Sequence, residues 1–61
     1  MDRVEIEKFR ELAKPRAFAA FVELDNLRHR AHRVGAFVLE ERLAQAVNAI
    51  ATLRADLEKG R

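Results

Sequence analysis

The residues best suited to chemistry lie together in the segment RHRAHR, residues 28–33, which holds three arginines and two histidines. No acidic residue occurs from position 26 to position 39. Arg28, Arg30 and Arg33 could contact the phosphates of a nucleic acid. The same charge could instead complement the dipole at a helix end, or the acidic surface of a partner protein.

The two histidines raise the possibility of a metal site. His29 and His32 are three residues apart, a spacing that places both on one side of a helix, and Asp25 could add a carboxylate. Arg28 and Arg33 flank these groups and would repel a cation. We therefore expect no metal and no cofactor.

The side chains that usually perform nucleophilic catalysis are missing from the composition. The chain has no serine, cysteine or tyrosine, and Thr52 has no histidine near it on the predicted helix. A glycine-rich phosphate-binding loop is also absent. We expect no enzymatic activity and no small-molecule substrate.

Helix-forming residues dominate the whole chain, which predicts a single all-α domain over residues 1–61. Asp2 is a suitable cap for a first helix, expected over about residues 2–13. The residue before a proline is disfavoured in helical geometry, and proline suits the first turn of a helix. A second helix is therefore expected over about residues 15–34, and a third over about residues 36–59.

Apolar residues recur every three or four positions in two series, each of which predicts a helix–helix contact. The first series is Ala17, Ala20, Leu24, Leu27, Ala31 and Val34, and the second is Ala36, Leu39, Leu43, Ala46, Ile50, Leu53 and Leu57. The two series are out of phase, so the helical register must change near Gly35.

Two structures would explain this change at Gly35. Gly35 could end one helix in a left-handed conformation, with another helix starting directly after it. Alternatively, one helix could run unbroken from Pro15 to about Lys59, with the register change accommodated inside it. Both alternatives predict amphipathic helices with broad apolar faces.

A chain of 61 residues buries too little surface to be stable easily on its own, and without cysteine it has no disulfide. We therefore expect a homodimer, or another homo-oligomer, with the core of a helical bundle. The residues expected at its interface are Leu24, Leu27, Ala31, Val34, Leu39, Leu43, Ala46, Ile50, Leu53 and Leu57.

These observations favour a small non-enzymatic oligomerisation or regulatory module that acts by protein–protein interaction. The alternative is a nucleic-acid-binding helical dimer that uses the basic segment. No stretch reads as a signal peptide or as an apolar membrane span, so we expect a soluble cytoplasmic protein with no membrane partner.

Overall fold

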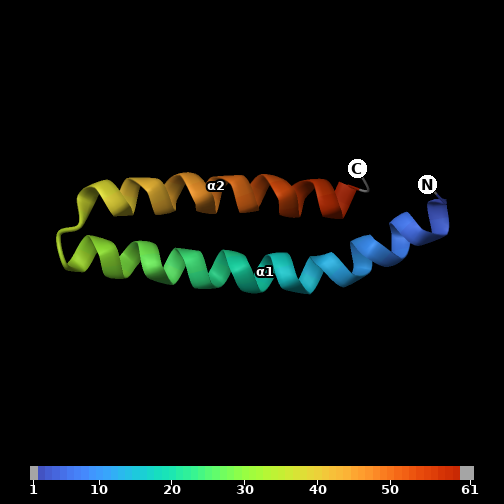
Figure 1. Cartoon of the computed structure of the whole chain (residues 1–61), viewed down its shortest axis with the longest axis horizontal. Helices are drawn as coiled ribbons and strands as arrows, with labels where there is room; N and C mark the ends of the chain where they lie inside the picture. Colours follow the sequence, from blue (N-terminus) through green and yellow to red (C-terminus); the bar gives the residue numbers. More distant parts are fainter. Residues whose placement is uncertain (1, 60–61) are drawn as a thin grey trace.

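The computed structural model describes residues 2–59, and these form two antiparallel α-helices joined by a short turn (Figure 1). Helix α1 spans Arg3–Arg33 and helix α2 spans Phe37–Lys59. The expectation of an all-α chain is confirmed over this range. The predicted single domain 1–61 also includes residues 1, 60 and 61, which lie outside the described residues.

Helix α1 begins with the expected aspartate cap. The Asp2 side chain accepts a hydrogen bond from the amide of Val4 at 3.2 Å, and the Asp2 carbonyl accepts one from the amide of Ile6 at 3.1 Å. Because the first amides of a helix have no partner inside it, this cap stabilises the start of α1.

The predicted break before Pro15 is wrong, because α1 continues through this residue. Proline removes one helical hydrogen bond and its ring presses on the carbonyl four residues earlier, which bends a helix without necessarily ending it. Figure 1 shows that the N-terminal part of α1 bends away from the axis of the rest. The predicted helices over residues 2–13 and 15–34 are therefore one bent helix.

The turn between the helices is the glycine cap that the sequence allowed. Gly35 has a φ of +77°, a left-handed conformation that residues with a Cβ rarely adopt. The amide of Gly35 donates to the carbonyl of His32 at 3.1 Å, and that of Ala36 donates to the carbonyl of Ala31 at 2.9 Å. This pair of bonds is the Schellman motif, which satisfies the last carbonyls of α1. The alternative of one unbroken helix to Lys59 is excluded.

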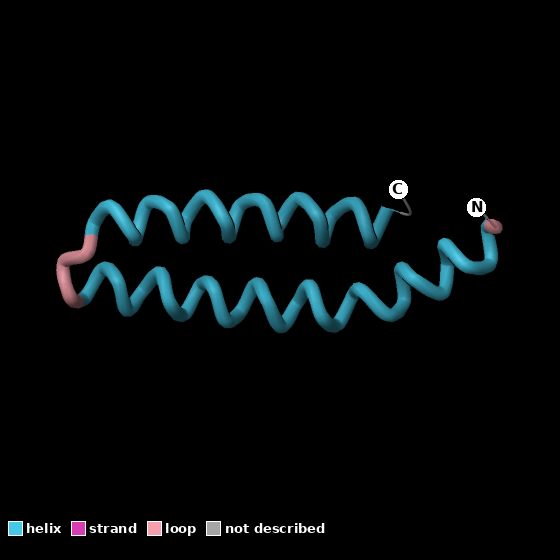
Figure 2. Tube along the Cα trace, in the orientation of Figure 1, coloured by secondary structure: helices cyan, strands magenta, loops and turns pink. Residues whose placement is uncertain are grey.

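The hairpin is long and thin, with only a small core. It measures 47 × 15 × 14 Å, and only Ala17 and Leu57 are buried among the apolar residues described. Figure 2 shows that α1 extends beyond the C-terminal end of α2, so its first turns have no helix beside them. The fold therefore leaves most apolar side chains exposed.

Candidate interaction surface

Along each helix, buried and half-buried residues recur every three or four positions, which marks the side that packs against the other helix. In α1 this contact line consists of Arg10, Lys14, Ala17, Phe21, Leu24, Arg28 and Ala31. In α2 it consists of Glu40, Leu43, Val47, Ile50, Arg54 and Leu57. The contact lines agree only in part with the two predicted apolar series.

The expected interface residues divide into two groups. One group lies on the contact lines inside the hairpin: Leu24, Ala31, Leu43, Ile50 and Leu57. The other group lies beside these lines: Leu27, Val34, Leu39, Ala46 and Leu53. The hairpin therefore covers only half of the predicted interface from within.

The second group shares one surface with residues of the same helical spacing. Each of its members follows a contact-line residue, or Ala36, by three positions, which places it on one flank of its helix. Because both helices are right-handed and run antiparallel, the corresponding flanks of α1 and α2 lie on the same side of the hairpin. We call this surface the apolar face, and it consists of Ile6, Ala13, Ala20, Leu27, Val34, Leu39, Ala46 and Leu53.

The larger side chains of the apolar face are well exposed. The exposed fraction is 40% for Leu27, 46% for Leu53 and 63% for Leu39. Between them lie Ala13, Ala20 and Ala46, whose small side chains would allow another helix to approach closely. Isolated exposed leucines are ordinary on protein surfaces, but a row of them on one side of two helices is typical of a binding surface.

The opposite side of the hairpin carries most of the polar contacts. Lys14 pairs with Glu11 at 2.8 Å, and the Arg54 guanidinium lies 4.9 Å from the ring centre of Phe18 and 5.1 Å from that of Phe21. Arg54 was not expected on a contact line, because the apolar pattern alone does not show that an arginine stem can cover aromatic rings.

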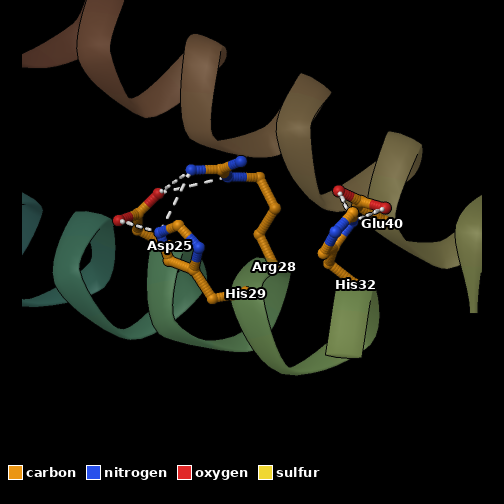
Figure 3. A network of polar contacts seen from close by, with 5 residues as sticks. All are labelled: Asp25, Arg28, His29, His32 and Glu40. Carbon is orange, nitrogen blue, oxygen red and sulfur yellow. Dashed lines mark hydrogen bonds and ion pairs between the residues drawn. The ribbon is translucent and has the colours of Figure 1, made fainter. Parts of the chain in front are cut away.

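The basic segment does not present its three arginines on one surface. Arg28 lies on the contact line and extends toward α2, where its guanidinium donates to Asp25 at 2.8 and 3.2 Å (Figure 3). This hydrogen bond holds the pKa of Asp25 below its ordinary value. Arg30 and Arg33, three residues apart, are both exposed on the side of α1 that faces away from the contact line. The expected three-arginine contact is therefore divided, with Arg28 already paired to an acid.

The two histidines contact different carboxylates. His29 Nε2 lies 3.4 Å from an oxygen of Asp25, while His32 Nδ1 lies 3.0 and 3.1 Å from the two oxygens of Glu40 at the start of α2 (Figure 3). The second contact joins the two helices across the turn. Residues 2–59 contain no group of three histidines, cysteines or acids close enough to hold a metal ion.

A shallow groove lies near the bend of α1, lined by Lys14, Pro15, Phe18, Arg54, Leu57 and Glu58. Its charged groups are of both signs and lie among apolar side chains. The groove offers no convergent set of polar groups that would define a ligand.

The first turns of α1 add a second exposed apolar region that the predicted series did not include. Val4, Phe9 and Leu12 are all more than half exposed, and they come before Pro15 in α1. The expected break at Pro15 separated these residues from the longer series, which is why their continuity with the rest of α1 was not anticipated.

Neither α1 nor α2, the helices of the described chain, has an apolar stretch long enough to cross a membrane. No protein-family model, curated protein or solved structure matches this chain.

Proposed function

We propose that this chain is a small non-enzymatic module of the cytoplasm that acts by protein–protein interaction and assembles as a homodimeric helical bundle. The observation that carries the proposal is the apolar face, where exposed leucines of both helices lie on the side of the hairpin opposite its main polar contacts. A second hairpin on this face would supply the neighbours that the two predicted apolar series require.

The surface area of the hairpin supports the same proposal. Its accessible surface is 4980 Å². A compact monomer of 7.0 kDa would expose ~4,000 Å², so the hairpin exposes about 1,000 Å² more. A stable protein–protein interface typically buries about 800 Å² from each partner. The excess surface is therefore of the size that one dimer interface would remove.

Sedimentation equilibrium at micromolar concentration tests the dimer directly. We expect twice the mass of the 7.0 kDa chain, together with a strongly helical circular dichroism spectrum. A folded, helical monomer at this concentration would refute the proposal.

A pair of matched substitutions tests the role of the apolar face. Leu53→Asp places a charge on this face, while Ala55→Asp places the same charge two residues later on the outer side of α2. We expect the Leu53 variant to dissociate, with or without loss of helicity, and the Ala55 variant to remain dimeric. An unchanged dimer in the Leu53 variant would show that the apolar face is not the interface.

Nucleic-acid binding is the second proposal, and the structure supports it less. Arg30 and Arg33 are exposed, but Arg28 is paired with Asp25. Phosphate contacts are strongest at low salt, so binding should be detectable at ~50 mM salt and weaker in an Arg30→Gln/Arg33→Gln variant. Absence of binding by the unmodified chain at this salt concentration would exclude the proposal.

A further inference from the structure

We propose that α1 pairs with α1 of a second copy in an antiparallel register centred on Ala20, so that Arg16 of each copy forms an ion pair with Glu23 of the other. This inference rests on the proposed homodimer and specifies how the two apolar faces meet. It is argued from the charges beside the apolar face and from the order of large and small residues along it.

Charged residues border the apolar face of α1 without a partner in their own hairpin. Arg16, Glu23 and Arg30 recur at intervals of seven residues along one side of α1, and Phe9 precedes them in the same series. Within the described residues none of the three charges takes part in an ion pair. By contrast, Glu11 and Asp25 on the opposite side are paired with Lys14 and Arg28 of the contact line.

An antiparallel pair of identical helices places residues at equal distances from the two-fold axis opposite each other. With the axis near Ala20, Arg16 lies opposite Glu23 of the second copy, and the same pair forms twice by symmetry. Phe9 then lies opposite Arg30 of the second copy, where a cation can stack on the aromatic ring. Each unpaired charge beside the face thereby acquires a partner.

The apolar residues fit the same register. Ala20 meets Ala20 of the second copy at the axis, and Ala13 meets Leu27, so a large side chain lies against a small one. Ile6 meets Val34, which covers the N-terminal turns of α1 that extend past α2. Since Arg54 contacts both Phe18 and Phe21, Leu53 of α2 is level with Ala20 and meets its own copy near the axis. Leu39 and Ala46 then lie beyond the end of the second copy's α2.

Neighbouring registers of the same helix faces bring like charges together. Because a helix face recurs about every seven residues, the alternatives differ by seven-residue shifts. A shift in one direction places Arg16 opposite Arg30 and Glu23 opposite Glu23, and a shift in the other places Arg16 opposite Arg16. A double shift pairs Glu23 with Arg30 but leaves roughly half of α1 without a neighbour.

The other symmetric arrangement stacks α1 of one copy on α2 of the second. In this arrangement, residues that lie at the same height along the hairpin face each other across the interface. Arg30 then lies beside Arg42 and Arg16 beside Asp56, while Glu23 faces the uncharged Ala49. This arrangement pairs Arg16 with an acid, sets Arg30 against another arginine and leaves Glu23 without a charged partner, so the α1–α1 arrangement matches these three charges better. Glu23 forms an ion pair only in the α1–α1 arrangement, so a substitution of Glu23 distinguishes the two arrangements.

The test reverses the two charges separately and together. Arg16→Glu and Glu23→Arg should each raise the dimer dissociation constant by about tenfold, because two attractive contacts become repulsive. The double variant should return to within about threefold of the unmodified chain, because the pair is restored with opposite polarity. Lys8→Glu, an exposed charge reversal away from the apolar face, should leave the constant unchanged.

Mixing the two single variants gives a stronger result. An equimolar mixture of Arg16→Glu and Glu23→Arg should form heterodimers about tenfold more tightly than either variant forms homodimers, because every facing pair is then of opposite sign. Weakening by Arg16→Glu alone, with rescue by Asp56→Arg, would instead establish the α1–α2 arrangement. A monomeric unmodified chain would refute the proposed function. A dimer whose dissociation constant does not change with these charge reversals would refute only the proposed register.

Discussion

Replacing Pro15 by alanine should stabilise this protein, although the residue lies where two helices were expected to meet. Pro15 is inside α1, with full helical turns on both sides. Its ring nitrogen cannot donate to the carbonyl of Glu11, and the ring crowds that carbonyl. The bend of α1 in Figure 1 is the visible consequence.

The magnitude follows from two opposing effects. Proline in a helix interior is ~3 kcal/mol less favourable than alanine. Against this, alanine loses the apolar surface that the exposed proline ring contributes to the groove, which it lines together with Phe18 and Leu57, and we estimate this loss at ~1 kcal/mol. The net gain in the free energy of unfolding should be about 2 kcal/mol, which corresponds to a rise in Tm of ~10 °C for a domain of this size.

Thermal and urea unfolding followed by circular dichroism at one fixed protein concentration would measure this gain. Lys8→Ala is the matched control, since it also introduces alanine at an exposed position of α1 but removes no proline; its effect should be below ~0.5 kcal/mol. A destabilised Pro15→Ala variant would refute the reasoning. It would mean that a new helix starts at Pro15, where proline is favoured over alanine.

Two further predictions concern the turn and the Asp25–Arg28 pair. Gly35→Ala should lower the free energy of unfolding by ~1 kcal/mol, and Gly35→Asn by less, because the left-handed φ penalises a Cβ although no atom lies close enough to clash with it; equal stability of the alanine variant in urea unfolding would contradict the cap. The carboxyl of Asp25 should titrate below its ordinary pKa of 3.8 by NMR, and Arg28→Gln should raise its pKa, because the Arg28 hydrogen bond is the largest cause of the lowering. Because the folded pKa is lowered, this pair stabilises the fold above the unfolded pKa and the contribution is lost as the pH falls through the folded one; an unchanged Asp25 titration in the variant would show that Arg28 is not the cause.

Asp2 is a position that the sequence predicted well, because its side chain precedes a helix start and can accept an amide hydrogen. At Gly35 the sequence predicted a change of register between two out-of-phase apolar series but allowed either a glycine cap or an unbroken helix. The left-handed φ of +77° shows that the cap is the outcome.

The prediction failed at Pro15 because two effects compete there. The residue before a proline disfavours helical geometry, which favours a break at Pro15. The apolar contacts that α1 makes with α2 after Pro15 favour a continuous helix. Lys14 and Ala17 lie on the contact line on either side of the proline, so ending the helix between them would separate two residues that both pack against α2. Tertiary packing therefore outweighs a local preference, and the outcome is a bend.

The contact lines also explain why charged residues could not be placed from apolar spacing alone. Arg28 and Arg54 lie on the contact lines, where each side chain is only half-buried. The aliphatic stem can therefore pack against the other helix while the guanidinium reaches an acid, as in Arg28, or an aromatic ring, as in Arg54. The apolar series instead follow the flanks that this hairpin leaves open. The leucines at positions 27, 39 and 53 lie on the flank beside the contact lines, where the hairpin leaves 40%, 63% and 46% of their surface exposed. Their regular spacing is accounted for when a second pair of helices lies on the same side, and this is the strongest argument in the sequence for the proposed dimer.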